Sequence, residues 1–577
     1  MSGNWCPYRN IYELFYDCMS TMPPASPPPP PPSGPPSDEP DVCVEGWPGQ
    51  AQAGSSLRAA QPLDGSSSGY IKFLDPVPDL QTEDGKDVTD NKDILGTMGT
   101  PVKAVAADSA ARVVLRIPAC RVNQKLTLTL LKDPNGTLAT PTDQVGTVSA
   151  LGASENRLDL EVKADRKVDG IPTAYAVYRP PEDFVRSGVL SDLTAVFRPI
   201  YFKVKPSKAK DENSTYVSNL DLLRPPVVLV HGLWDSRSAW NSFPLFSNPP
   251  RDNGAVLFTI SRANYDRPLF VTWGSPSADP TDVLTTYVPA ALASANANQL
   301  SFTYNAPYVH GQIANAIVSF RQGDNSLKVR AASAQADVVA HSMGGLVTRD
   351  ISLLPEYVDK ASFDAGNIHK LITIGTPHYG TPFATEVLKD PLVESILALQ
   401  GRLAFGWGVV VGWQLMVPGA VYDMQGDTTG TGGGLTPNLT ALNAQGNPHP
   451  LRVAAIAGRL DPDTNLQGLS SRWRKVQKPA AQIVGSLYGC GPCKIESALS
   501  AGTWNTVFGG NDSDAMVSVT SQLASRGQES FLGVIHSPSL EALGFSGPGE
   551  LEKQSGIPGW VLFLLNQPAG SDYFTNF

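Results

Sequence analysis

Residues 336–350 read ADVVAHSMGGLVTRD, and this stretch decides the fold that the sequence predicts. A short apolar strand precedes one tight turn at Ser342, and a helix follows from about Leu346. A serine held in such a strained turn lifts its hydroxyl clear of the sheet, while the helix N-terminus behind it favours a developing anion. Ala340 and Gly344 are small enough to let the strand and helix pack closely. Ser342 is therefore a candidate nucleophile, and a solvent-exposed helix-capping serine is the alternative.

Apolar runs on both sides of this stretch indicate a parallel sheet. Continuous apolar strands that alternate with helical stretches are typical of a mostly parallel sheet with helices on both faces. Chemistry in such sheets sits at the carboxyl ends of the strands, which directs the search for further site residues. The predicted strands are PVVLV (226–230), DVVA (337–340), KLITI (370–374), RVAAIA (452–457) and FLGVI (531–535).

Changes in composition and residue pattern along the 577 residues divide the chain into three regions. Residues 1–100 are predicted to be a mostly irregular, disordered Pro-rich arm with a polyproline linker at 23–40, so deletion of 1–95 is expected to leave the catalytic region active. Short alternating runs predict a small all-β, sandwich-like domain over 101–206. Residues 216–577 form the predicted α/β catalytic domain.

Charge and composition exclude some functions. The net charge is −10 and no Lys/Arg run stands out, which argues against a nucleic-acid partner. The six cysteines permit disulfides without proving an oxidising compartment. The N-terminal residues lack a basic segment followed by an apolar one, so no standard secretory signal is expected there.

The candidate base comes from the positions of the seven histidines. His536 directly follows the last predicted strand, where a base for Ser342 belongs, with a surface histidine as the alternative. The other six belong to turns or loops elsewhere, or lie on the wrong side of the expected order of nucleophile, acid and base. After the first strand, His231-Gly232-Leu233-Trp234 places the Leu233 N–H where it can face an oxyanion opposite the Met343 N–H.

Two loops offer a candidate acid. Asp461 and Asp463 follow the strand at 452–457, in a pattern that also favours an Asx-turn. Asp514 stands in GGNDSDAMVSV, and a solvated loop carboxylate is its alternative role. The topology of the sheet leaves both loops open.

Together, VVLVHGLW, AHSMGGL, TIGTPHYGTP and the D-x-M-V segment at Asp514 resemble the bacterial lipases and esterases of the α/β-hydrolase superfamily. The resemblance covers about 216–577. It implies an α/β-hydrolase fold and carboxylic-ester hydrolysis by a Ser–His–Asp triad. In that family the acid often lies a little over twenty residues before the histidine, which favours Asp514, 22 residues before His536. Some relatives bind calcium near the acid loop, but Pro538 stands two residues after the histidine here, so no metal site is carried over.

The resemblance also predicts the kind of substrate and the cellular location. No cofactor or metal is expected. The implied substrate is a small-molecule or polymeric ester, either free or at a lipid interface, and the implied location is extracellular or at the cell surface. An acyltransferase would use the same triad with an alcohol in place of water, so that alternative stays open.

A charge-free stretch, LAFGWGVVVGWQLMVPGAV at 403–421, is long enough to span a membrane. It contains four glycines and Pro418 and lies between two predicted strands of one sheet, so no transmembrane span is expected. We predict instead a cap or lid over about 385–440, with a buried core helix as the alternative. The aromatic residues expected to line the acyl pocket are Trp234, Phe405, Trp407 and Trp413.

Cys490-Gly-Pro-Cys493 is the dithiol pattern of thioredoxins and suggests a redox protein as a third function. The motif lies inside the catalytic region and has no βαβ unit of its own. A structural loop or a small disulfide between Cys490 and Cys493 is therefore favoured.

Overall fold

The computed structural model describes residues 71–76, 99–389, 419–426, 434–460, 508, 512–524, 529–538 and 547–577. Within these ranges the residues not described are 120, 154, 169, 207–214, 234, 244–256, 267–269, 272–285, 288–297, 299 and 445. Every described residue belongs to one compact unit.

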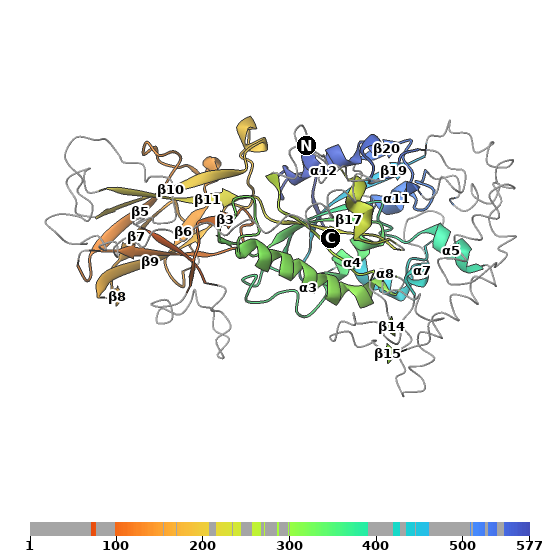
Figure 1. Ribbon diagram of the computed structural model, residues 1–577, viewed down its shortest axis with the longest axis horizontal. Coiled ribbons are helices and arrows are strands. Elements are labelled where there is room, and N and C mark those ends of the chain that lie inside the picture. The colour runs from red at the N-terminus through yellow and green to blue at the C-terminus, as the bar shows by residue number, and fades with distance from the viewer. Residues whose placement is uncertain are drawn as a thin grey trace, which may run out of the picture. The chain divides into compact units, whose positions relative to one another are not determined.

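Two β-sheets are formed mainly by the residues that precede the predicted catalytic region (Figure 1). Their facing surfaces pack through aromatic side chains, because the ring of Phe202 lies 5.2 Å from that of Phe73 and 5.1 Å from that of Tyr178. One sheet contains β1 (Lys72–Asp75), β2 (Thr100–Pro101), β4 (Val113–Pro118), β6 (Thr147–Ser149), β8 (Arg166–Val168) and β9 (Ile171–Arg179). The other contains β3 (Ala104–Ala106), β5 (Lys125–Leu131), β7 (Asp159–Lys163), β10 (Phe197–Pro206), β11 (Tyr216–Leu223) and β16 (Ala331–Ala332).

The boundaries of these sheets differ from the predicted domain boundaries. β1 lies in the arm that the sequence predicts to be irregular, yet it pairs with β2 and β4 and buries Phe73 and Leu74. β11 was assigned to the catalytic region but pairs along its length with β10. The cause is the same in both cases. Each strand is stabilised by pairing with its neighbours in the sheet, and the local sequence pattern does not show which strands pair.

β1 also connects to the predicted catalytic region through a buried ion pair. Asp75 accepts hydrogen bonds from Arg321 at the end of α3 (Phe302–Arg321), with Nη2 2.6 Å from Oδ2 and Nε 2.9 Å from Oδ2. The side chains are only 4% and 10% exposed, respectively. Residues 72–75 are therefore part of the folded body.

We expect deletion of residues 1–69 to leave the free energy of unfolding nearly unchanged, and deletion of 1–95 to lower it clearly. The longer deletion removes β1 and leaves Arg321 without Asp75, and loss of one partner of a buried ion pair costs about 3–5 kcal/mol. Thermal and urea unfolding would measure the difference. The 1–69 deletion carrying Asp75→Asn isolates the ion pair, and equal stability of both deletions would contradict the prediction.

The predicted catalytic region is built on one mostly parallel sheet in the order β13–β12–β17–β18–β19–β20, with β21 antiparallel to β19. These strands are β12 (Val227–Val230), β13 (Ile260–Arg262), β17 (Ala336–His341), β18 (Ile368–Ile374), β19 (Arg452–Arg459), β20 (Ser530–Leu532) and β21 (Thr575–Asn576). Each predicted strand is present, but β20 ends at Leu532 rather than at residue 535. The chain turns at Gly533, where φ is +77°, and Ile535 then pairs with Gly549 instead.

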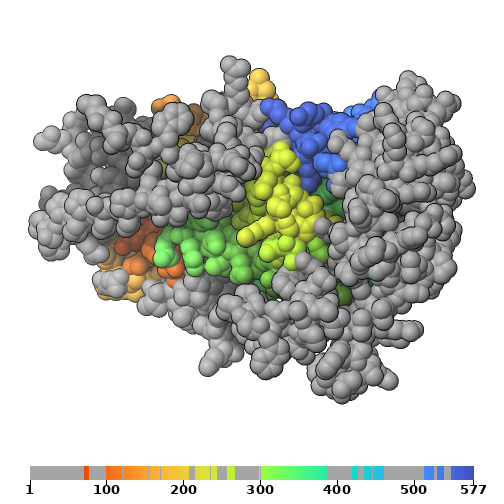
Figure 2. Space-filling model, turned by 45° about the vertical axis from the view of Figure 1, so that its right-hand side comes forward, coloured from red at the N-terminus to blue at the C-terminus, as the bar shows by residue number. Residues whose placement is uncertain are grey.

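Both faces of this sheet are buried. Val228, Val338 and Leu371 pack on one side with α3, α4 (Met343–Ile351) and α8 (Pro437–Leu442). Their neighbours along each strand, such as Leu229 and Val339, pack on the other side with α12 (Ile557–Leu565) and η6 (Arg237–Ser242). In Figure 2 the yellow-green surface that includes η6 meets the blue C-terminal residues, with which Trp240 shares this core. Such a sheet leaves its strand ends as the place for polar chemistry.

Shorter elements complete the described part of the chain: α5 (Pro382–Lys389), α7 (Ala420–Asp423), α11 (Val519–Gln522), β14 (Phe270–Val271), β15 (Thr286–Tyr287), η3 (Pro141–Asp143), η4 (Leu190–Leu193) and η11 (Lys553–Ser555). Within the ranges described above, no helix combines the length and the apolar character needed to cross a bilayer.

Candidate active site

Ser342 occupies a strained turn between a strand and a helix. β17 ends at His341 and α4 begins at Met343, so Ser342 alone forms the turn, with φ 55° and ψ −130°. Positive φ is uncommon for a residue other than glycine and is maintained only where neighbouring contacts enforce it. Here the Ser342 N–H donates to the Ile374 carbonyl at 2.8 Å, and the Thr376 hydroxyl donates to the Ser342 carbonyl at 2.9 Å.

Three glycines make this turn possible. A Cβ on Gly232 would lie 2.7 Å from the Ser342 Cβ, one on Gly344 would lie 2.4 Å from the His231 carbonyl oxygen, and one on Gly345 would lie 2.1 Å from the Thr376 hydroxyl. These contacts are too short for any other residue. They bring the turn after β12 directly against Ser342, so the segments that carry Leu233 and Met343 meet at this residue.

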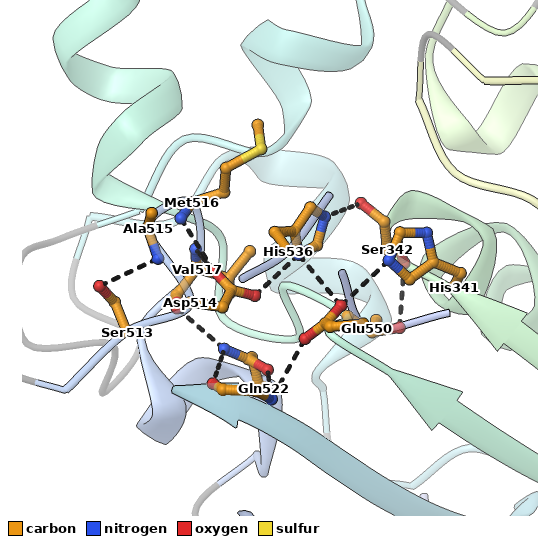
Figure 3. A network of polar contacts seen from close by, with 12 residues as sticks. His341, Ser342, Ser513, Asp514, Ala515, Met516, Val517, Gln522, His536 and Glu550 are labelled. Carbon is orange, nitrogen blue, oxygen red and sulfur yellow. Dashed lines mark hydrogen bonds and ion pairs between the residues drawn. The ribbon is translucent and has the colours of Figure 1, made fainter. Parts of the chain in front are cut away.

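His536 connects Ser342 to a buried carboxylate (Figure 3). Its Nε2 lies 2.8 Å from the Ser342 Oγ, and its Nδ1 lies 2.7 Å from Asp514 Oδ2. His536 is 5% exposed and Asp514 is fully buried, whereas Ser342 remains half-buried. The structure thus brings together the three residues at which the sequence predicts nucleophile, base and acid.

The Asp514 loop holds its carboxylate in one orientation. Oδ1 accepts the backbone N–H groups of Met516 and Val517 at 2.8 and 2.7 Å, which leaves Oδ2 facing His536. Ala515 adopts φ 78° to close this loop, and the His536 N–H donates to the Asp514 carbonyl at 3.0 Å. Side chain and backbone together therefore fix His536 relative to Asp514.

A second buried carboxylate, which the sequence analysis missed, reaches the same imidazole. Glu550 is fully buried, and its Oε2 lies 3.3 Å from His536 Nδ1 and 3.0 Å from His341 Nε2. Its Oε1 accepts the Gly458 N–H at 3.1 Å. The sequence signals a close-packed turn through Gly547-Pro548-Gly549 just before Glu550. It carries no sign of which residues that turn contacts.

Opposing effects set the pKa values in this network. Burial disfavours the imidazolium of His536, but the carboxylates of Asp514 and Glu550 outweigh burial and raise its pKa to about 10. Burial raises the pKa of Asp514, against the effect of His536 and with the help of Glu550. Burial acts in the same direction on Glu550, but His536 and His341 lower its pKa to about 2.

The remaining histidines have other surroundings. Their contacts are His231 with Gly232 and Tyr265, His310 and His449 with the ring of Tyr357, His369 with Asp337, and His378 with Arg349 and Thr373. The ligand atoms of His341, His536 and Glu550 lie within 4.8 Å of one another, a spacing that a metal ion can bridge. Because a hydrogen bond and an ion pair already join these atoms, we interpret the cluster as a polar network.

Several predicted residues lie outside the described part of the chain. They are Trp234, most of the predicted lid with Phe405, Trp407 and Trp413, the alternative acids Asp461 and Asp463, and the pair Cys490 and Cys493. Their roles stay predictions.

Comparisons with known proteins found one family model and several solved structures. Residues 298–396 match the model of the PGAP1-like alpha/beta domain. No curated protein sequence matches the chain. Among solved structures, the mature lipase BlEst2 of Bacillus licheniformis is 14% identical (63% of this chain, 95% of the lipase, TM-score 0.27). EstA from Clostridium botulinum is also 14% identical (60% and 88%, TM-score 0.28), as is the Staphylococcus hyicus lipase (55% and 81%, TM-score 0.24). The family model covers the segment that carries the Ser342 turn, and its description as an alpha/beta domain agrees with the mostly parallel sheet of this region.

Proposed function

We propose that this protein is a carboxylic-ester hydrolase in which Ser342 is the nucleophile, His536 the general base and Asp514 the acid that orients it. One observation carries the proposal: an unbroken path of short contacts from the Ser342 Oγ through His536 to Asp514, starting at a strained strand-to-helix turn. A helix-capping serine has no need of this arrangement, because its hydroxyl accepts a hydrogen bond from its own helix.

In the proposed reaction Ser342 Oγ attacks the ester carbonyl carbon while His536 Nε2 takes the hydroxyl proton. The tetrahedral intermediate expels the alcohol, which receives that proton from His536, and an acyl-enzyme remains. Water then attacks the acyl carbonyl with His536 again as base, and the carboxylic acid leaves. Asp514 holds the imidazole in the tautomer that carries its proton on Nδ1 and stabilises the imidazolium as it forms.

The oxyanion is assigned to the N–H groups of Leu233 and Met343. Two facts support this assignment: α4 begins at Met343, so its first N–H groups have no partner within the helix, and Gly232 packs directly on Ser342. Donors of this kind act on the charge that develops in the transition state rather than on the substrate.

A panel of p-nitrophenyl esters from C2 to C16 tests the proposal, assayed with and without a competing alcohol. Hydrolysis that depends on Ser342 is the expected result. Transfer of the acyl group to the alcohol in preference to water would identify an acyltransferase with the same residues. Absence of turnover on every ester, together with no labelling by a fluorophosphonate probe, would contradict the proposal.

Medium-chain esters are expected to exceed acetate in kcat/KM. The reason lies in the sequence of the predicted lid, where aromatic and aliphatic residues predominate and each buried CH₂ of an acyl chain contributes about 0.8 kcal/mol. Glycines 406, 408 and 412 would allow the lid to move. The combined Trp407→Ala and Trp413→Ala variant should weaken the preference, whereas a strict acetyl preference that it leaves unchanged would rule out an apolar acyl pocket there.

A further inference from the structure

We propose that Glu550 is a second positioning carboxylate for His536: it shares the Nδ1–H with Asp514 and stabilises the imidazolium that forms when Ser342 loses its proton. The inference rests on the proposed function of this site. Glu550 touches neither Ser342 nor a reacting atom in the proposed reaction, so its action passes through His536.

Backbone pairing places Glu550 beside the base. Ile535, immediately before His536, forms a parallel bridge with Gly549, and the Glu550 N–H donates to the Ile535 carbonyl at 3.0 Å. The close approach needs glycine, because a Cβ on Gly547 would lie 2.3 Å from the Gly533 carbonyl oxygen and one on Gly549 2.4 Å from Pro538. Residues 547–550 are thus fixed against the loop that carries His536.

Two further glycines form a slot for the carboxylate itself. A Cβ on Gly375, after β18, would lie 2.1 Å from Glu550 Oε2, and one on Gly458, in β19, would lie 2.7 Å from Oε1. The carboxylate therefore fills space at the carboxyl ends of the neighbouring strands β18 and β19. Figure 3 shows it between His536 and His341, on the side of the imidazole away from the Ser342 hydroxyl.

The charges around His536 explain what such a carboxylate does. The titratable groups that face the imidazole are Asp514 and Glu550 at Nδ1 and His341, whose ring centroid lies 4.8 Å away. A carboxylate buried without hydrogen-bond donors would be very costly. Two of the polar groups beside Glu550 are His341 Nε2 and the Gly458 N–H. The third neighbour is His536 Nδ1, so Glu550 becomes a better partner when that ring gains a positive charge.

The direction of the pH effect follows. Both carboxylates favour the imidazolium of His536, whereas catalysis needs the neutral ring as base, so kcat/KM of the wild-type protein should rise with pH through an apparent pKa above 7. Removal of the Glu550 charge destabilises the imidazolium and should move this acid limb to lower pH.

Glu550→Gln tests the inference, since the amide has the size of the carboxylate and lacks its charge. We expect the apparent pKa of the acid limb to fall by about one to two units. Plateau kcat should fall about tenfold, because the imidazolium in the transition state is less well stabilised. Glu552→Gln is the matched control: Glu552 is two residues away and accepts the Gly549 N–H at 2.9 Å, so this change should leave the profile in place.

Gly458→Ala provides a second variant that displaces the Glu550 carboxylate without removing any charge. A shift of the acid limb in the same direction as with Glu550→Gln would support the inference. If either variant folds poorly, the pKa of His536 can be read directly by ¹⁵N NMR of histidine-labelled protein at low temperature, with His536→Asn used for assignment. Circular dichroism melts report the folded state of each variant.

The two proposals fail in different ways. If wild-type protein turns over no ester and is not labelled by fluorophosphonate, the proposed function is wrong, while NMR still tests the link between Glu550 and His536. If the wild type is active and Glu550→Gln lowers only the melting temperature, with the acid limb and the His536 pKa unchanged, Glu550 is merely structural and the inference is overturned.

Discussion

Ser342→Ala is expected to lower kcat for p-nitrophenyl esters by about 10⁴-fold or more while the protein stays folded. Alanine fits the space of serine and leaves the contacts of the turn intact, so the loss reports the missing Oγ rather than a change in packing. The residual rate should come from the oxyanion donors and substrate binding alone. Stopped or continuous assays at saturating ester, together with a circular dichroism spectrum, measure both parts of this prediction.

Covalent labelling identifies the nucleophile independently. A fluorophosphonate probe should modify Ser342 in the wild-type protein, as located by peptide mass spectrometry, and should not modify the alanine variant. Ser352→Ala is a matched control at the far end of α4, where the hydroxyl donates to the Arg349 carbonyl at 2.8 Å; labelling should survive there. Labelling that persists after Ser342→Ala would show that another residue is the nucleophile.

Asp514→Asn should lower kcat by about 10³-fold, the second-largest effect that we expect. An amide in place of Oδ2 removes the anion that faces Nδ1 and favours the wrong tautomer of His536, whereas the two backbone donors to Oδ1 can keep the loop in place. The effect is expected to be smaller than that of Ser342→Ala because Glu550 Oε2, 3.3 Å from the same nitrogen, can accept its proton.

Two further variants sharpen this result. Asp461→Asn should have a much milder effect, and a nearly inactive Asp461 variant beside an active Asp514 variant would transfer the role of acid to Asp461. The double variant Asp514→Asn, Glu550→Gln should lose more activity than the product of the two single losses, because each carboxylate replaces part of the other's function. Simple multiplication of the losses would indicate that the two act independently on the imidazole.

Local sequence patterns were sufficient for the elements that carry the nucleophile. β12 is a continuous apolar run and β17 and β18 each contain one, and both faces of each strand are buried, so the pattern follows directly from burial. The turn at Ser342 is equally local, since Ala340 and Gly344 stand at fixed offsets on either side of it. His536 could be found because the chain has few histidines and one of them lies just beyond the last strand.

Other features depend on neighbours that are distant in the chain. β1 is a strand only because β2 and β4 pair with it, and β20 stops at Leu532 because Gly549 takes the place of a strand partner at Ile535. Topology left Asp514 and Asp461 equal as candidate acids, and only the resemblance to known lipases favoured Asp514. A carboxylate in a polar loop has the same local pattern whether it faces water or an imidazole.

The sequence by itself determined where the five predicted strands lie along the chain, the turn at Ser342 and the residue types that the proposed ester hydrolysis requires. Only the tertiary structure decided that Glu550 faces His536, because that contact depends on glycines at 375, 458, 547 and 549, each of which leaves room for a backbone or carboxylate from another segment. Apolar periodicity reports whether a residue is buried, which is a property of its own element. The identity of a buried polar group's partner is a property of the packing between elements, and it is that packing which turns one imidazole and two carboxylates into a single network.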